Sequence, residues 1–210
     1  MFIIYIKLFI ISVTFCNNFR STGVGQLKYE NGDRFQGQFK DSKKEGSGIY
    51  KYKSGTIYDG MFVKDKFHGF GTLTSKNGDC YKGNFAYGKK DGKGKYTYYN
   101  GDIYDGEWVA DKKDGKGIYI YKVSGDRYEG MWHDNLKEGR GNYIYSNGDR
   151  YDGSFSDGNK EGRGKVFWKT GEKFEGVMKN DMMHGEGQIT DRNGDTKNIL
   201  YNMNAIEELK

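Results

Sequence analysis

Large apolar and polar side chains alternate along this chain from residue 23 onward, in two short stretches that recur as a pair. The clearest copy places Tyr104, Gly106 and Trp108 at alternate positions, and the second stretch then runs from Gly115 to Tyr121. Because side chains alternate between the two faces of a strand, each stretch is predicted to be a β-strand. The first aromatic residue recurs at a spacing that is constant but for one added position, at Phe35, Tyr58, Tyr81, Tyr104, Tyr128, Tyr151 and Phe174.

Three glycines in each copy recur as regularly as the aromatic residues. One follows the first aromatic residue by two positions, and two more form a Gly-x-Gly at the start of the second strand. Glycine weakens a strand and usually marks the close approach of another group. We therefore expect rings of neighbouring strands to lie over these glycines. The residues that define the repeat are Tyr58, Gly60, Tyr81, Gly83, Tyr104, Gly106, Trp108, Gly115, Gly117, Tyr128, Gly130, Trp132, Tyr151 and Gly153.

Asn-Gly-Asp or a variant of it separates each second strand from the next first strand, as in Asn77–Asp79 and Asn147–Asp149. Asn-Gly between alternating stretches is a strong hairpin signal, because a type I′ turn needs positive φ at both central residues. We therefore predict type I′ turns at these positions. The one additional residue falls in Lys122–Gly125, where a bulged three-residue loop would accommodate it.

The pattern Y-x-G-x-[WF] followed by G-x-G-x-[YL], repeated at this nearly constant spacing, resembles the MORN (membrane occupation and recognition nexus) repeat. The resemblance implies an all-β fold, a single-layer antiparallel β-hairpin solenoid of about seven MORN repeats. The predicted array spans residues 23–196, with a partial repeat at 23–34 and full repeats starting at 35, 58, 81, 104, 128, 151 and 174. His68 and His184 match the His-Gly usual in the family. The other five copies carry Glu or Asp there, so a shared role for that histidine is not expected.

The two ends of the chain depart from the repeat. Residues 1–22 are a hydrophobic segment, in which Lys7 interrupts an apolar run too short for a membrane helix of ~20 residues. Three interpretations stay open, namely a cleaved signal peptide, an uncleaved anchor and an apolar cap. Residues 197–210 are predicted to be a C-terminal cap or tail, with a turn or two of helix over Asn204–Lys210 that covers the last hairpin.

Composition argues against several kinds of chemistry. The net charge of +5 comes from 34 basic and 29 acidic residues that are interspersed, so a nucleic-acid-binding footprint is not indicated. Cys16 and Cys80 form no disulfide framework or metal motif, and the Gly-Lys-Gly segments precede strands rather than the helix that a phosphate loop needs. We therefore predict no catalytic residues, no cofactor, no metal and no small-molecule substrate.

One set of side chains has functional content. Lysines recur between the two strands of each copy, and stacking of the copies would align them along one edge. Such an edge is either a solvated rim or a contact for acidic lipids or proteins. The candidate residues for an anionic partner are Lys43, Lys44, Lys89, Lys90, Lys112, Lys113, Lys137 and Lys160.

Resemblance to the MORN family implies a non-enzymatic scaffold for protein–protein, membrane and cytoskeletal attachment, including ciliary attachment and self-association. One alternative is a peripheral binder of anionic phospholipids. A second is a regulatory fragment that works with a separate SET-type methyltransferase or lipid kinase, since the segment after Thr196 leaves no room for a catalytic domain of ~100 residues. The resemblance implies the cytoplasmic face of a membrane, the cytoskeleton or a cilium, whereas a cleaved signal peptide implies the secretory pathway.

Overall fold

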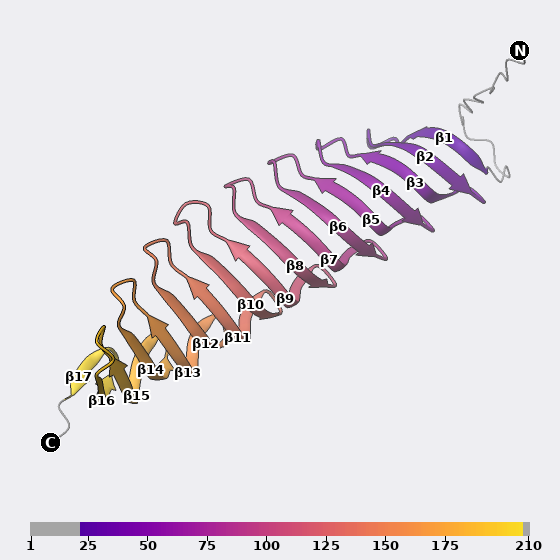
Figure 1. Cartoon of the computed structure of the whole chain (residues 1–210). Helices are drawn as coiled ribbons and strands as arrows, with labels where there is room; N and C mark the ends of the chain where they lie inside the picture. The colour runs from indigo at the N-terminus through magenta and orange to yellow at the C-terminus, as the bar shows by residue number, and fades with distance from the viewer. Residues whose placement is uncertain (1–21, 208–210) are drawn as a thin grey trace, which may run out of the picture. The chain divides into compact units, whose positions relative to one another are not determined.

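The computed structural model describes residues 22–207, which form β-strands joined by short turns (Figure 1). These residues fall into two compact units, 22–99 and 100–207. The first unit contains β1 (Gly23–Lys28), β2 (Arg34–Lys40), β3 (Lys43–Lys51), β4 (Ile57–Val63), β5 (Lys66–Thr74), β6 (Cys80–Ala86) and β7 (Lys89–Thr97). The second contains β8 (Ile103–Val109), β9 (Lys112–Ile120), β10 (Arg127–His133), β11 (Leu136–Ile144), β12 (Arg150–Ser156), β13 (Asn159–Phe167), β14 (Lys173–Lys179), β15 (Met182–Thr190), β16 (Thr196–Asn202) and β17 (Ala205–Glu207).

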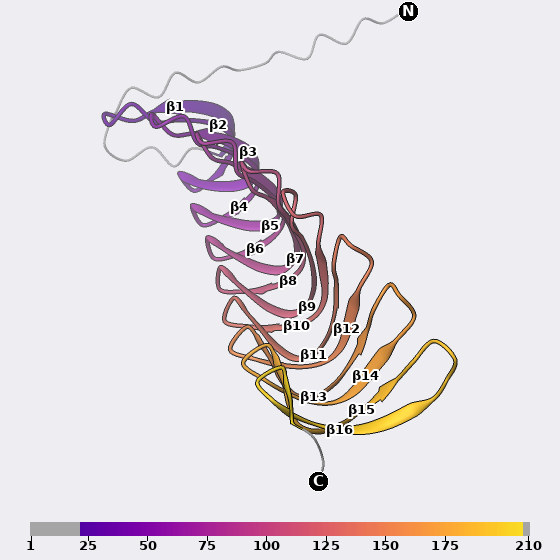
Figure 2. The ribbon, with the colours of Figure 1, turned by 90° about the vertical axis from the view of Figure 1, so that its left-hand side faces the viewer.

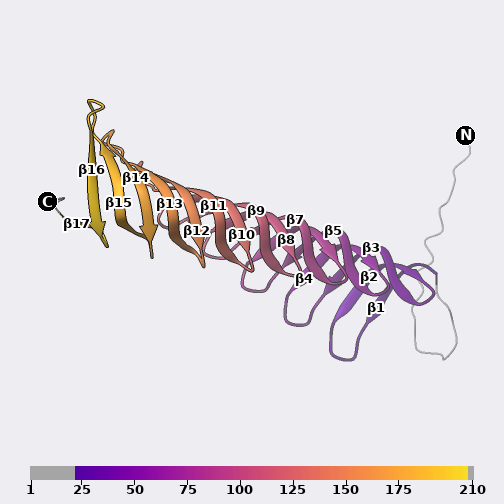
Figure 3. The ribbon, with the colours of Figure 1, turned by 90° about the horizontal axis from the view of Figure 1, so that it is seen from below.

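Each unit is a single layer of antiparallel hairpins, as predicted. Consecutive strands pair in chain order, and Figure 3 shows those of the second unit side by side. The glycines lie directly opposite one another across the sheet, so that Gly48 of β3 faces Gly60 of β4, which faces Gly71 of β5. No helix occurs between residues 22 and 207, and this part of the chain therefore has no helical membrane span. The hydrophobic segment at the N-terminus, with its open interpretations, lies outside the described residues except for Thr22.

The core of each unit is a row of aromatic side chains on one face of the sheet. Tyr58 and Tyr104 are completely buried, and Trp108 is 3% exposed. The first and third large residues of each copy occupy equivalent places, while the intervening positions point to the other face. The strands are visibly bent within each unit (Figure 2). A single layer can therefore bury this row only by curving around it.

The predicted type I′ conformation of the Asn-Gly turns is wrong. At the Asn-Gly turns only the glycine has positive φ, for example Gly32 at 92°. Type I′ dihedral angles occur instead in the two-residue turns at the opposite end, as at Lys64 (47°) and Asp65 (70°). The additional residue of the fourth copy does fall where we expected it, because the Gly125 amide bonds to Tyr121 O four residues back instead of three.

The strain of these two-residue turns is offset by hydrogen bonds to the preceding copy. A non-glycine residue with positive φ is uncommon, although Asp and Asn tolerate this conformation best. The Asp65 amide donates to Lys44 O at 3.0 Å, and the Lys44 amide donates to Asp65 Oδ1 at 2.9 Å. Asn204 makes the same two bonds to Met183 at the other end of the array. The turn residues therefore connect successive copies.

The first glycine of each Gly-x-Gly lies in a β-bulge. We predicted that an aromatic ring would lie over this glycine, and that prediction is wrong. Gly46 has φ of 84°, and the β2–β3 register shifts between Gly37 and Phe39. Glu45, Gly46 and Ser47 consequently lie opposite Gln38 alone. This irregularity turns the start of the second strand relative to its remainder.

The predicted C-terminal helix is wrong. Residues 196–207 form the strands β16 and β17, and β16 pairs with β15 in the register of the earlier copies. Tyr201 follows Met178 at the ordinary spacing of the repeat and is likewise buried, at 4% exposure. Asn204 supplies the usual two-residue turn. The segment beyond the seventh repeat thus continues the repeat for one more short hairpin.

Candidate functional site: the aromatic face and its lysines

The first aromatic ring of each copy lies over two paired glycines. A Cβ added to Gly60 or Gly71 would stand within 2.8 Å of the Tyr58 ring carbon Cζ. For Gly71 of β5 the covering ring comes from the neighbouring strand β4, as we expected, whereas for Gly60 it comes from the same strand. Tyr58 Oη also donates to Met61 O, three residues along the same strand, at 2.8 Å. The ring therefore lies flat over the glycines along its own strand. Because the strands bend around this buried row, we call the aromatic face concave (Figure 2).

A second residue closes over this ring in every copy. In five copies it is a lysine whose ammonium lies over aromatic rings, as Lys113 Nζ does over Trp132 at 4.4 Å and Tyr119 at 5.0 Å. Phe67 takes this place in one copy and stacks on Tyr58 with ring centroids 3.7 Å apart. Met183 takes it in the last copy. The five lysines are Lys44, Lys90, Lys113, Lys137 and Lys160.

The structure therefore divides the candidate lysines into two groups. Lys43, Lys89 and Lys112 are exposed at the start of their strands, where we predicted an edge. The five lysines over the rings are half-buried on the concave face instead. Burial lowers the pKa of Lys137, and neighbouring Lys160 lowers it further, while Asp181 acts in the opposite direction. The sequence did contain a signal for this division, because only the five lysines over the rings lie an even number of positions from the glycines and the large residue that follow, as Lys113 does from Gly115 and Tyr119.

A ladder of Asp–Tyr hydrogen bonds joins four of the turns between copies to the copy that follows. Tyr96 Oη donates to Asp79 Oδ2 at 3.0 Å, and the Tyr99 amide donates to Asp79 Oδ1 at 2.8 Å. Burial and the bond to Asp79 raise the pKa of Tyr96 to about 12. Burial also raises the pKa of Asp79, but the bonds from Asn77, Tyr99 and Tyr96 together hold it below its usual range. The same pairs form between Tyr50 and Asp33, Tyr119 and Asp102, and Tyr143 and Asp126.

We did not predict this ladder, although the sequence contains a signal for it. Each of the four tyrosines follows its aspartate by 17 residues. Where the turn residue is Thr56 or Glu172, the residue equivalent to the tyrosine is Leu73 or Ile189. Val166, which takes that place after Asp149, marks the one copy in which an aspartate lacks a tyrosine.

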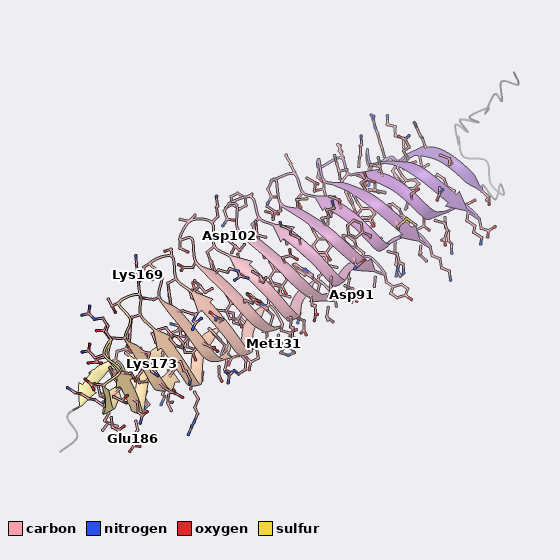
Figure 4. The ribbon with its side chains drawn as sticks, in the orientation of Figure 1. Asp91, Asp102, Met131, Lys169, Lys173 and Glu186 are labelled. Atoms are coloured by element: carbon pink, nitrogen blue, oxygen red, sulfur yellow. The ribbon has the colours of Figure 1, made fainter. Side chains whose placement is uncertain are left out.

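A further row of aromatic side chains stands at the rim of the concave face. Its members lie two positions after the ladder tyrosines and are only partly buried. Tyr145 pairs with Tyr143 at a centroid distance of 4.7 Å, and Tyr121 pairs with Tyr119 at 4.5 Å. In the second unit, Figure 4 shows Lys169 and Asp102 along the margin of the sheet that carries the turns between copies. Met131 and Glu186 lie toward the other margin. The outer aromatic row consists of Tyr52, Tyr98, Tyr121, Tyr145 and Trp168.

The histidines have separate environments. His68 and His184 each bury Nδ1 without a hydrogen-bond partner. His133 Nδ1 lies 3.0 Å from Asp114 Oδ2, and with Asp134 these residues place three ligand atoms within 4.8 Å. Lys112 Nζ already lies 2.9 Å from Asp134 Oδ2. This exposed cluster thus contains its own cation.

The repeat geometry defines a class, the single-layer β-hairpin array in which aromatic rings cover paired glycines. Sequence comparison identifies the particular family. The MORN repeat model matches residues 35–57, 58–80, 81–103, 104–125, 128–150, 151–173 and 174–196. The chain therefore belongs to the MORN-repeat family, which is generally a non-enzymatic repeat scaffold. No curated protein matches the chain.

Two solved structures resemble the chain distantly. One is the TCP domain of SAS-4 (dCPAP) of Drosophila melanogaster in complex with a proline-rich motif of Ana2 (dSTIL). It is 13% identical, with a TM-score of 0.49 over 90% of this chain and 97% of that chain. The other is the G-box domain of the microcephaly protein CPAP, 8% identical, with a TM-score of 0.46 over 86% of this chain and 100% of that chain.

Proposed function

We propose that this chain is a non-enzymatic scaffold that binds protein partners along the outer aromatic row. The observation that carries the proposal is the partial exposure of these rings beside a fully buried row. Tyrosine and tryptophan are enriched in protein interfaces because they combine a large apolar area with a polar group. In the second unit the repeat places three of these rings in consecutive copies, Tyr121, Tyr145 and Trp168. A partner, or a second copy of the chain, would therefore meet several rings at once.

Site-specific photo-crosslinking tests this proposal. A benzophenone amino acid at Tyr121 should crosslink a discrete protein partner in cells, since that side chain lies on the outer row. The control is the same substitution at Ile120, which is 38% exposed and points to the other face. A product at twice the mass of the chain would indicate self-association. Equal crosslinking from both positions, or from neither, would exclude the outer row as the binding surface.

Binding to anionic membranes is the second candidate, and the exposed lysines favour it. Lys43, Lys89 and Lys112 recur at equivalent positions on the edge, where the Lys112–Asp134 pair is solvated and contributes little to stability. Reversing all three to glutamate should abolish flotation with vesicles that contain a phosphoinositide. Lys113→Glu is not a suitable probe, because Lys113 lies against three rings. Absence of flotation by the unmodified chain would rule out this candidate.

The cellular location of the chain and its association with a separate enzyme can each be tested. Family membership supports a role at a membrane–cytoskeleton junction or a cilium, which imaging of a C-terminally tagged chain tests directly. Sequencing the N-terminus of that chain would decide whether residues 1–22 are removed, as the secretory alternative requires. Recovery of a methyltransferase or lipid kinase in equal amount with the chain would support the regulatory alternative.

A further inference from the structure

The concave face of the second unit contains one shallow depression that no repeat signature accounts for. It has a volume of about 370 Å³ and is lined by Trp168, Thr170, Glu172, Ile189, Asp191 and Tyr201. Trp168 and Tyr201 contribute aromatic surface, and Glu172 and Asp191 contribute carboxylates. Tyr201 is 4% exposed, so one wall belongs to the packed core.

The depression exists because the last two copies depart from the repeat at the positions that fill the concave face elsewhere. Ile189 stands where four other copies have a ladder tyrosine. Asp191 replaces an aromatic residue of the outer row. Smaller or shorter side chains at these positions leave space between Trp168 and Tyr201.

The same substitutions leave a carboxylate without its usual donors. In the copies with a ladder, the turn carboxylate accepts a tyrosine hydroxyl and the amide 20 residues later, as Asp126 does from Tyr143 and Ser146. Glu172 occupies that turn position, but Ile189 has no hydroxyl. Among residues 22–207 the Glu172 carboxylate accepts a hydrogen bond from Thr170 Oγ1 alone. Within residues 22–207 neither Glu172 nor Asp191 lies within 4.0 Å of a lysine or arginine nitrogen.

We infer that this depression binds a basic side chain, lysine or arginine, of a protein partner. The inference rests on the proposed scaffold function and assigns one chemical group to the partner. An ammonium or guanidinium group would replace the missing hydroxyl donor of Glu172 and would pair with Asp191. Cations are also attracted to the face of an indole ring, and the aliphatic stem of lysine or arginine packs on apolar surface. Charge complementarity thus selects a cationic group over an apolar or acidic one.

The indole resonances of the full chain provide the test. The chain has three tryptophans, and only Trp168 lines the depression, while Trp108 and Trp132 are buried in the core. The probe is an acetylated, amidated pentapeptide of Ser and Gly with a central arginine. We expect it to shift the Trp168 indole signal saturably, with Trp108 and Trp132 unmoved. Peptides with norleucine or glutamate at the centre should have no effect, and one with lysine should bind.

Two variants distinguish this site from general attraction between charges. Glu172→Gln should weaken binding about tenfold, whereas Glu186→Gln, an exposed carboxylate outside the depression, should change it less than twofold. Ile189→Tyr should abolish binding and raise the unfolding midpoint, because it restores the ladder tyrosine. Failure of the arginine peptide to shift Trp168, an equal shift by norleucine, or equal weakening by Glu186→Gln would overturn the inference. If crosslinking from Tyr121 persists in that case, the scaffold function stands and only the pocket is wrong.

Discussion

The hydroxyl of Tyr143 donates a hydrogen bond to Oδ2 of Asp126, one copy earlier, across 2.9 Å. The other oxygen of Asp126 accepts the Ser146 amide at 2.9 Å. One carboxylate therefore holds both the side chain and the backbone of the following copy. Because a repeat protein is stabilised largely by the interfaces between neighbouring repeats, this pair contributes to the cohesion of the array.

Tyr143→Phe removes only this hydroxyl and should destabilise the chain by about 1–2 kcal/mol, because Asp126 loses a charge-assisted bond in a partly buried site. Denaturant unfolding measures the change. Tyr145→Phe in the same copy is the matched control, since the Tyr145 hydroxyl makes no hydrogen bond within residues 22–207. Its effect should stay within about 0.5 kcal/mol. Equal effects of the two changes would show that the ladder bond adds nothing.

Acid should destabilise the chain through the same carboxylates. Burial raises the pKa of Asp126, but bonds from the Ser146 amide, Tyr143 and Ser124 outweigh it and hold the pKa below its usual range. As pH falls, the Asp126 carboxylate is therefore protonated at a higher pH in the unfolded chain than in the folded chain. The stabilisation is fully present above the ordinary aspartate pKa of about 3.9 and is lost as pH falls through the folded value. Asp102 and Asp79 shift in the same direction.

Asp126→Asn isolates that contribution. The free-energy difference between the variant and the original chain should be largest near neutral pH and should narrow below about pH 4. Unfolding curves at several pH values from acidic to neutral provide the measurement. A difference that is independent of pH would mean that ionisation of Asp126 does not contribute.

The paired glycines give a steric prediction. A Cβ on Gly48 would lie 2.5 Å from Phe35 Cε2, so Gly48→Ala should destabilise the chain by about 3 kcal/mol through overpacking. Gly25→Ala is the control, because its Cβ would meet Phe39 at an ordinary 3.5 Å. Thermal unfolding of both variants tests the difference. If Gly25→Ala were as damaging as Gly48→Ala, strand flexibility and not the Phe35 ring would explain the glycine.

Most of the fold was predictable because the same strand pattern occurs in seven copies. Tyr58 and Gly60 are two positions apart, as residues on one face of a strand must be, and chance does not reproduce that pattern at a nearly constant interval. The C-terminal strands were missed because β16 has Lys197 and Ile199 where the other copies have an aromatic residue and a glycine. Only Tyr201 preserves the signature there.

The site was less predictable, because it depends on curvature that alternation does not encode. Lys160 Nζ lies 5.1 Å from the centroid of the Tyr145 ring, although Lys160 is near the start of β13 and Tyr145 follows the end of β11. The depression beside Trp168 exists because Ile189 is smaller than a ladder tyrosine and has no hydroxyl. This difference could be interpreted only after the structure had shown which contacts the tyrosine makes at that position in the other copies.

The lysines over the rings should tolerate loss of charge but not its reversal. Phe67 and Met183 occupy the equivalent position in two copies, so the site accepts an apolar side chain of similar length. Lys113→Met should therefore change stability by less than about 1.5 kcal/mol, as volume-conserving changes do. Lys113→Glu places an anion against three aromatic faces and should lower the free energy of unfolding by more than about 2 kcal/mol.

Lys112→Glu is the adjacent control, because that side chain is exposed and its pair with Asp134 is solvated. Its effect on the denaturation midpoint should be small, and equal loss in both glutamate variants would indicate that the position over the rings has no special role.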